Sequence, residues 1–332
     1  MKVNQATTLI NDLAGKGIPF FVMTDFELQE IVVKPLDQLQ DKILYDFKGK
    51  SNHVYNQQKT LTDQLELEAY PFDKYYHEFQ QVHSELKYGN SFLINLTARH
   101  KIKTRLKLKQ VFDQVQAKYK LYVNSNGQHF TCYSPETFVT IKDGLISSCP
   151  MKGTIDASIP NAKEILLADR KETAEHNTIV DLIRNDLSQY AKGVTVTKYK
   201  YLDLIKSREK DLYQMSSEIQ GTLPENYQEQ LGDIIFSMLP AGSISGAPKK
   251  KTVEIIKHAE ALSRGYYTGI CGLYDGENFD SCVMIRFMEE VAGRLYYRSG
   301  GGITFLSEVE KEYQEMVDKI YLPTVLIESP KA

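Results

Sequence analysis

The sequence predicts an α+β fold built on antiparallel sheets, and two observations predict it. Apolar segments with the pattern of strands follow one another through short polar turns, most clearly at Asp143-Gly144, the dipeptide favoured in two-residue type I′ hairpin turns. Helical spacing of apolar residues occurs only in a few long segments, which do not alternate with single strands as a repeating βαβ arrangement requires. The 332 residues can form one large domain or two closely associated ones.

Residues 1–70 are predicted to be a β-rich scaffold segment. Strand-like stretches at 17–23, 27–33 and 42–47 are separated by polar turns, and no cluster of ionisable residues there suggests chemistry. We expect residues 71–325 to form the functional domain and to share one core with the scaffold segment.

The remaining elements follow from periodicity and from the signals that end helices. Apolar residues spaced three and four apart indicate helices, and continuous or alternating apolar runs indicate strands. Ser307 and Glu310 have the spacing of a capping box, which predicts a helix start at Ser307. In chain order we predict a helix from Pro71 to Gly89, a strand at 91–97, a helix at 106–115, strands over 119–149, and helices over 162–187, from Pro248 and from Ser307.

The composition makes several classes of protein improbable candidates. Apolar residues make up 42% of the chain and charged residues 25%, as in ordinary globular proteins. The net charge is −3 with no basic cluster, so we expect no nucleic-acid partner. No window approaches the ~20 apolar residues of a membrane span, no leader is recognisable, and the four cysteines form no CxxC pair. We therefore expect a cytoplasmic protein with free thiols and no membrane partner.

A predicted hairpin brings an acid and an amine to the same end of two strands. With the turn at Asp143-Gly144, Glu136 pairs opposite Met151, and Lys152 follows directly. Pro150 cannot donate a ladder hydrogen bond and should end the pairing there, so the face on which each side chain lies is open. A surface ion pair at a sheet edge is the alternative.

Two predicted helices each carry a pair of carboxylates on one face. Glu172 and Glu175 are three residues apart, as are Glu312 and Glu315, and Lys319 lies one turn beyond the second pair. Together the two helices could supply oxygen ligands to Mg²⁺, which takes one or two carboxylates and keeps several waters. Solvated helix faces are the alternative.

Two glycine-rich segments and one arginine are candidates for binding an anion. Segment 239–251 lacks the spacing of a nucleotide-binding loop, but as a small-residue turn before a helix it suits a carboxylate. Gly300 to Gly302 would let a ligand approach the backbone closely, although either segment could be a bulge or a tight corner. Alternation along 279–287 places Arg286 on a strand, where it could grip a carboxylate or pair with Asp280.

Taken in order, ten segments resemble the chorismate-binding family of anthranilate, aminodeoxychorismate, isochorismate and salicylate synthases. The resemblance spans about residues 75–320 and implies a sandwich-like core of antiparallel sheets with flanking helices. The matching segments are 89–97, 134–138, 149–154, 169–186, 216–221, 239–256, 264–272, 279–286, 296–303 and 310–319.

The resemblance also implies roles for individual residues. Mg²⁺ would be held chiefly by Glu175 and Glu315, with Glu172 and Glu312 acting through bound water, and Glu136 would be the general acid that protonates the departing 4-hydroxyl. The implied substrate contacts are Tyr267, Arg286, Gly300 and Gly302 at the pyruvyl carboxylate, Ser245 and Gly246 at the ring carboxylate, and Lys319 as a further contact.

Lys152 selects among the members of this family. Anthranilate synthases carry alanine at this position, and isochorismate synthases place a lysine in the segment that matches 90–99, which here contains none. The resemblance thus implies component I of aminodeoxychorismate synthase, which aminates chorismate with ammonia through a covalent Lys152 adduct, for 4-aminobenzoate and folate synthesis. A nucleophilic lysine must be neutral, so its pKa must fall from about 10.4.

Two positions depart from the family pattern, and they leave alternatives open. Leu93 stands where many relatives have glutamine, and Gln214 stands where several have the histidine thought to assist pyruvate elimination in anthranilate synthases. Gln214 mildly favours a product that keeps its enolpyruvyl group. The alternatives are anthranilate synthase component I and a non-catalytic chorismate sensor or docking protein. We expect ammonia to come from a separate glutamine amidotransferase subunit or from solution.

Overall fold

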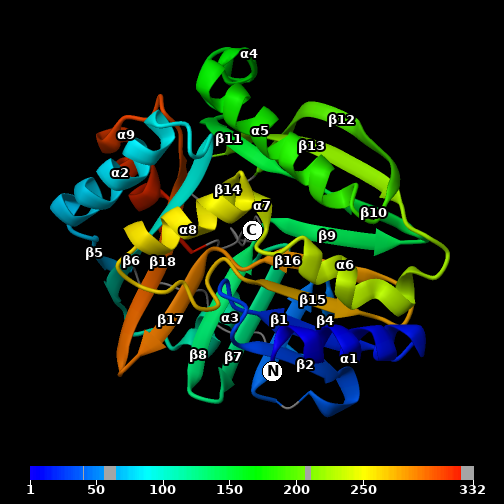
Figure 1. Cartoon of the computed structure of the whole chain (residues 1–332). Helices are drawn as coiled ribbons and strands as arrows, with labels where there is room; N and C mark the ends of the chain where they lie inside the picture. Colours follow the sequence, from blue (N-terminus) through cyan, green and yellow to red (C-terminus); the bar gives the residue numbers. More distant parts are fainter. Residues whose placement is uncertain (40, 56–64, 206–210, 323–332) are drawn as a thin grey trace, which may run out of the picture.

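Two large antiparallel sheets form the centre of the molecule, as the sequence predicts (Figure 1). The computed structural model describes residues 1–39, 41–55, 65–205 and 211–322. Within these ranges each sheet has nine strands, and all strand pairs are antiparallel. No helix in the described ranges is both long and apolar enough to cross a bilayer.

The first sheet carries the expected hairpin at its centre. Asp143 and Gly144 both have positive φ, 52° and 74°, and Lys142 pairs with Leu145, which is the geometry of a type I′ turn. In sheet order its strands are β11 (Met151–Asp156), β13 (Leu212–Thr222), β10 (Leu145–Ser148), β9 (Thr137–Lys142), β16 (Phe279–Val283), β15 (Ile270–Tyr274), β1 (Phe20–Thr24) and β2 (Ile31–Pro35), while β12 (Lys192–Ile205) pairs with β13.

The second sheet places the triple-glycine segment inside a strand. Gly300 to Gly302 pair with Thr97 to Asn95 of the neighbouring strand. The strands are, in sheet order, β14 (Gly246–Ala247), β6 (Leu93–Lys103), β18 (Arg294–Ile303), β17 (Phe287–Val291), β8 (Gln128–Ser134), β7 (Tyr119–Ser125), β3 (Ile43–Phe47) and β4 (Lys50–Ser51), while β5 (Glu66–Glu68) pairs with β6.

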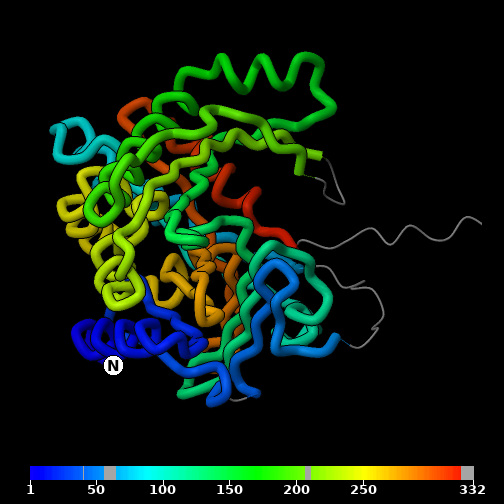
Figure 2. Tube along the Cα trace, turned by 90° about the vertical axis from the view of Figure 1, so that its right-hand side faces the viewer, coloured from blue at the N-terminus to red at the C-terminus, as the bar shows by residue number. Residues whose placement is uncertain are grey.

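Helices cover the outer faces of the two sheets. Two of them, α4 and α5, lie at the end of the molecule opposite the N-terminal helix α1, as Figures 1 and 2 both show. The α-helices are α1 (Val3–Gly15), α2 (Phe72–Lys87), α3 (Leu108–Gln114), α4 (Ala162–Ala168), α5 (Arg170–Leu187), α6 (Leu231–Ser237), α7 (Gly242–Ser245), α8 (Lys249–Ala259) and α9 (Val309–Asp318), and two short 3₁₀ turns are η1 (Leu36–Gln38) and η2 (Tyr227–Gln230).

Three buried clusters hold these layers together. One fills the space between the sheets, with Phe21 from the first sheet facing Tyr45 and Leu121 from the second. A larger cluster packs α1, α2, α5, α6 and α8 against the sheets, and a third packs α3 against the outer face of the second sheet. Burial of apolar side chains on both faces of a sheet fixes its register, because a shift by one residue would turn every side chain to the opposite face.

The first 70 residues begin with a helix that the strand pattern does not predict. Helix α1 buries Ala6, Ile10 and Leu13, which are three and four residues apart, and its Asn11 side chain bonds the Gly232 amide of α6. Strands β1 and β2 belong to the first sheet, whereas β3, β4 and β5 belong to the second.

Two helix boundaries differ from the sequence predictions. The helix predicted over 162–187 is interrupted at Asp169, whose extended backbone ends α4 and whose side chain caps α5 by accepting from the Glu172 amide at 2.9 Å. The capping box predicted at Ser307 does not form, since its hydroxyl accepts from the Thr304 amide instead and α9 begins at Val309. The Asp169 and Ser307 side chains each accept a hydrogen bond from a nearby backbone amide. Helical spacing alone does not reveal such local hydrogen bonds.

The strand predicted over 279–287 also ends early. Strand β16 stops at Val283, and Arg286 has a left-handed backbone with φ of 52°. Here the chain leaves the first sheet and enters the second at Phe287. Arg286 therefore lies on a crossover between the sheets and not on a strand, and its face cannot be read from alternation.

Candidate active site

Lys152 and Glu136 come together by a different route from the predicted hairpin ladder. Pairing between β9 and β10 ends at Thr140 and Ser147. After Pro150 the chain pairs with β13 instead, with Met151 opposite Ser216, so the expected Glu136–Met151 pairing is wrong. The two side chains are nevertheless within electrostatic range, because the charge of Lys152 lowers the pKa of the Glu136 carboxyl and that of Glu136 raises the pKa of Lys152.

A glycine in β18 lets Lys152 approach the carboxylates. Its Nζ lies 3.6 Å from Glu175 Oε2. A Cβ added to Gly302 would lie 2.9 Å from Lys152 Nζ and 3.0 Å from Glu175 Oε2, so a side chain there would push the two apart. The nearest apolar neighbour of this position is the Leu93 side chain, 3.1 Å from the same point.

Four carboxylates from α5 and α9 converge around Lys171, a residue that the sequence analysis did not single out. Lys171 Nζ lies 2.7 Å from Glu312 Oε1 and 3.5 Å from Glu175 Oε1, so one ammonium bridges the two helices. Glu315 pairs with Lys319 at 2.7 Å. The spacing of Lys171 four residues before Glu175 was the only available sequence signal, and it does not show the contact across to α9.

The crowding of these carboxylates perturbs their ionisation. Burial, followed by the charge of Glu175, raises the pKa of Glu172 to about 7. Burial alone would also raise the pKa of Glu315, but the ammonium groups of Lys319, Lys152 and Lys171 together outweigh it and lower this pKa to about 2. The pKa values of two neighbouring carboxyls, Glu172 and Glu315, are thus shifted in opposite directions. Shifts of this kind are typical of functional sites.

The carboxylates of this cluster are suited to a divalent cation, although in this structure the Lys171 ammonium lies between them. Glu312 Oε2 is buried without a hydrogen-bond partner, whereas Glu312 Oε1 and Glu175 Oε1 contact the Lys171 ammonium. Buried anionic oxygens of this kind are suited to bind a hard cation such as Mg²⁺. Among the described residues no three acidic, histidine or cysteine side chains stand close enough to hold a metal as they are placed. The Lys171 ammonium supplies counter-charge to Glu175 and Glu312.

Glu136 is held by the short helix α7. The Ser243 hydroxyl donates a hydrogen bond to Glu136 Oε1, and the Glu136 amide donates to Ser134 Oγ at 3.0 Å. Burial raises the pKa of Glu136, and Ser243 and Lys152 offset only part of this effect. A carboxyl with a raised pKa can hold a proton and deliver it to a leaving group.

The remaining candidate residues lie at the crossover and at close backbone contacts. Burial raises the pKa of Tyr267 to about 12, and the charge of Arg286 acts on it. Arg286 Nε is buried without a hydrogen-bond partner, and its guanidinium lies 5.2 Å from the Tyr321 ring centroid. The Lys319 ammonium donates to the Gly300 carbonyl at 2.9 Å. These residues leave one guanidinium donor available to an anion.

Ser245 and Gly246 follow Ser243 in the same turn. The Ser245 hydroxyl is buried and donates to the Ala241 carbonyl at 2.9 Å. Gly246 has a φ of 131°, and a Cβ there would overlap the Leu93 carbonyl. The close approach of β14 to β6 therefore requires glycine at this position.

The thiol of Cys271 is not accessible as a nucleophile. Gly269 and Cys271 have the Gly-x-Cys spacing found at some nucleophilic cysteines. However, Cys271 lies fully buried in β15, 3.4 Å from the Cys282 sulfur, and burial raises its pKa. A buried thiol of this kind is inert.

Comparisons with known proteins are consistent with one family. The family described as chorismate binding enzyme matches residues 19–324. An uncharacterized PabA-like protein of Pasteurella multocida is 49% identical over 316 residues, which cover 94% of this chain and 96% of the relative. Aminodeoxychorismate synthase component 1 of Bacillus subtilis is 30% identical over 266 residues, which cover 76% of this chain and 56% of the relative.

One solved structure supports the same conclusion. Anthranilate synthase component I of Streptococcus pneumoniae superposes with a TM-score of 0.64 at 25% sequence identity. The superposition covers 78% of this chain and 58% of that structure. The fold is therefore shared with this protein over the superposed part of the chain.

Proposed function

The chain belongs to the chorismate-binding enzyme family, and we propose that within it the chain is an aminodeoxychorismate synthase component I, which aminates chorismate with ammonia. The observation that carries this proposal is the partly buried Lys152, whose Nζ lies 3.6 Å from Glu175 Oε2 and which is within electrostatic range of Glu136. A lysine at this place can act as a nucleophile, which the alanine of anthranilate synthases cannot. The similarity to a synthase of this name in Bacillus subtilis supports the proposal.

The proposed reaction proceeds in two balanced steps. The neutral Lys152 amine bonds to ring carbon 2, the double bond shifts, and the carbon 4–oxygen bond breaks as Glu136 gives its proton to the departing hydroxyl, which leaves as water. Ammonia then bonds to carbon 4, the double bond returns, and the bond between carbon 2 and the Lys152 nitrogen breaks to release the neutral amine, while the ammonium formed at carbon 4 returns one proton to the Glu136 carboxylate. The burial that raises the pKa of Glu136 keeps this proton available.

Lys152 must lose its proton before it can attack. Burial lowers its pKa, but the charges of Glu175, Glu315, Glu172 and Glu136 outweigh burial and raise it. When bound by Glu175 and Glu315, with Glu172 and Glu312 in support, Mg²⁺ would neutralise these carboxylates and the ring carboxylate of chorismate. With these carboxylates neutralised, burial would be the dominant influence on the pKa of Lys152. Burial lowers this pKa and would therefore favour the neutral amine.

The other candidates supply contacts for the substrate. Arg286 and Tyr267 would bind the pyruvyl carboxylate, together with backbone groups at Gly300 and Gly302. Ser245 and Gly246 would line the ring carboxylate site, and Lys319 would contact the substrate beside them. The unpartnered Arg286 Nε supports this assignment, since a buried donor without a partner is costly unless a ligand satisfies it.

Anthranilate synthase component I is the second candidate. The structural similarity to such a protein favours it. Lys152 argues against it, and so does Gln214, which lies on β13 opposite Thr154, where several relatives have a histidine. In either case ammonia would come from a separate glutamine amidotransferase subunit or from solution.

The deciding experiment is to incubate the purified chain with chorismate, ammonium and Mg²⁺, and to identify the product by mass. We expect aminodeoxychorismate, which a lyase then converts to 4-aminobenzoate. Fluorescent anthranilate as the main product would overturn the proposal in favour of the second candidate.

A further inference from the structure

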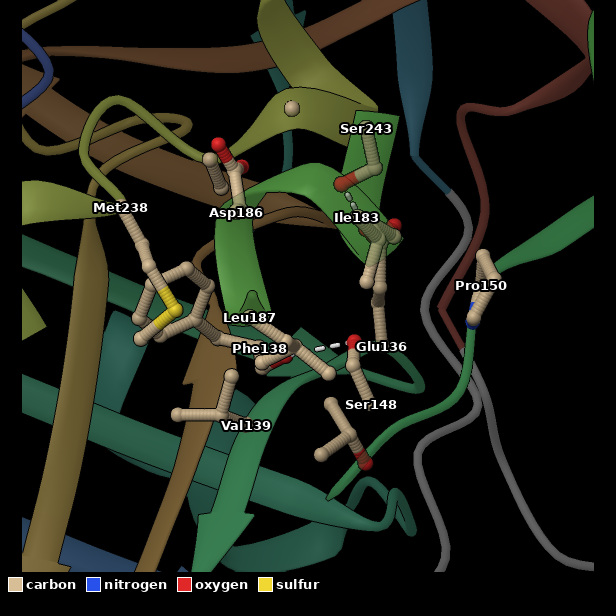
Figure 3. Close-up of a pocket in the computed structure, with 13 residues that line it drawn as sticks. Glu136, Phe138, Val139, Ser148, Pro150, Ile183, Asp186, Leu187, Met238 and Ser243 are labelled. Atoms are coloured by element: carbon tan, nitrogen blue, oxygen red, sulfur yellow. Dashed lines mark hydrogen bonds between the residues drawn. The ribbon is translucent and has the colours of Figure 1, made fainter. Parts of the chain in front are cut away.

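A small cavity lies directly behind Glu136, between β9, α5 and α7. Its volume is about 20 Å³. Figure 3 shows Phe138, Val139 and Met238 on one side of it and Glu136 and Ser243 on the other. Pro150, two residues before Lys152, also contributes to the wall, so the cavity adjoins the site of the proposed reaction.

The size of this cavity admits only a very small molecule. A water molecule needs about 10–15 Å³ by this measure. Ammonia has nearly the same size as water and therefore fits, whereas the ring of chorismate does not. The cavity is thus a place for a nucleophile or a solvent molecule and not for the organic substrate.

The wall combines apolar side chains with polar ones, among them Glu136, Ser148 and Ser243, and this mixture suits a small neutral molecule that can form hydrogen bonds. Val139, Leu187 and Met238 line it with buried apolar side chains. The carboxylate of Asp186 is already paired with Lys249 at 2.7 Å, so it is not an unpaired anion that would hold ammonium. A charged ammonium would lose its hydration against such a wall, whereas neutral ammonia loses much less.

We propose that this cavity holds the ammonia that attacks carbon 4. The inference rests on the proposed function, in which Glu136 touches the hydroxyl that leaves carbon 4. Ammonia in this cavity would lie against the Glu136 carboxyl, which can accept an N–H hydrogen bond from it, and would have to move past this side chain by only a short distance to reach carbon 4. The walls would also exclude larger amines.

The first test narrows the cavity. Val139→Ile and Ala241→Val add one and two carbon atoms to its wall. We expect each to raise the KM for ammonia about tenfold, equivalent to about 1.4 kcal/mol of binding, with the KM for chorismate within about twofold of the parent value. Val111→Ile is the matched control, because Val111 is fully buried in the separate cluster beneath α3.

The second test enlarges the cavity and has a readout that a loss of packing cannot mimic. Val139→Ala removes two carbon atoms, so we expect this variant to use methylamine and form a product heavier by one methylene, while the parent and Val111→Ala do not. Thermal unfolding of each variant shows whether it is folded.

The outcomes separate this inference from the proposed function. If the folded narrowing variants keep the parent KM for ammonia, or if Val139→Ala never accepts methylamine, the cavity is a packing void and the inference is wrong while the amination stands. If the parent forms no amino product from ammonia, the proposed function fails and this inference fails with it.

Discussion

The carboxylates around Lys152 favour its protonated form, whereas a nucleophilic amine must be neutral. Burial alone would favour the neutral amine, yet the nearby carboxylates hold the pKa of Lys152 above its usual value. The same carboxylates are the proposed metal ligands. We infer that nucleophile and cation site are coupled, because a bound cation would neutralise the carboxylates and so remove the influence that raises the pKa of Lys152.

We predict a covalent adduct on Lys152. Stalled turnover should yield a chain heavier by a dehydrated chorismate unit, located by mass spectrometry on the peptide that contains residues 149–154. Lys152→Ala should form no adduct, and it recreates the alanine of anthranilate synthases, so some anthranilate can appear. If Lys152→Ala makes aminodeoxychorismate at the parent rate and the parent shows no adduct, covalent catalysis is wrong.

Glu136→Gln should fold normally and lose activity by about 10²–10⁴-fold, the usual contribution of a general acid. The amide keeps the hydrogen bond from Ser243 but has no proton to deliver. Steady-state kinetics measure the effect, and Ser243→Ala is the matched variant. Ser243→Ala removes only the hydrogen bond that positions Glu136, so the loss of activity in this variant should be smaller. A loss below about tenfold in Glu136→Gln would remove this residue from the mechanism.

At the scale of single elements, the helices show what spacing can and cannot predict. Two glutamates three residues apart must share a helix face, so the pairs on α5 and α9 could be read directly from the sequence. That Lys171 bridges from α5 to Glu312 on α9 could not, because the contact depends on how the helices pack. Arg286 was misplaced for a similar reason, since alternation does not show where a chain changes sheets.

Mg²⁺ should stabilise the protein through α5 and α9. A ligand that binds only the folded state adds about 2.7 kcal/mol at a concentration 100 times its Kd. We expect saturating Mg²⁺ to raise the Tm of the parent and of Glu164→Gln, an exposed acid on α4. Glu175→Gln and Glu315→Gln should lose both this increase and turnover. An unchanged Tm in the parent, or full activity after chelation, would contradict the metal assignment.

The break between α4 and α5 should matter for both stability and the site. Asp169 caps α5 three residues before Glu172, and loss of such a cap costs about 1 kcal/mol. We expect Asp169→Ala to lower the free energy of unfolding by this amount in urea titrations. Asp169→Asn keeps an accepting oxygen and should lose much less. Equal losses in the two variants would show that the hydrogen bond is not the cause.

At the scale of the whole molecule, patterning predicted the class of fold better than its connections. The turn at Asp143-Gly144 and the alternation of many strands identify antiparallel sheets because these signals are local. The first 70 residues gave no sign that β1 and β2 join one sheet while β3 and β4 join the other. This division depends on long-range pairing, for example between Phe20 and Tyr274, which no local pattern specifies.

His100 on β6 forms hydrogen bonds to β18 and to the segment just before α2. It is fully buried on β6, where its Nδ1 accepts from the Tyr70 amide at 3.1 Å, just before α2. Its Nε2 lies 3.0 Å from Ser299 Oγ on β18. The neutral ring with its proton on Nε2 satisfies both contacts, whereas a protonated ring would place two N–H groups against each other.

The stability of the whole protein should therefore fall in acid through His100. Burial lowers its pKa from 6.5 to about 4, so between these values the unfolded chain binds a proton that the folded chain does not. The stabilisation is complete above pH 6.5 and is lost as the pH falls toward 4, by an amount on the order of 3 kcal/mol. Urea titrations at several pH values should show a shallower pH dependence for His100→Asn than for the parent, although this variant is less stable at pH 7. His77→Gln, on the exposed face of α2, should retain the parent slope, and an unchanged slope in His100→Asn would mean that another group is responsible.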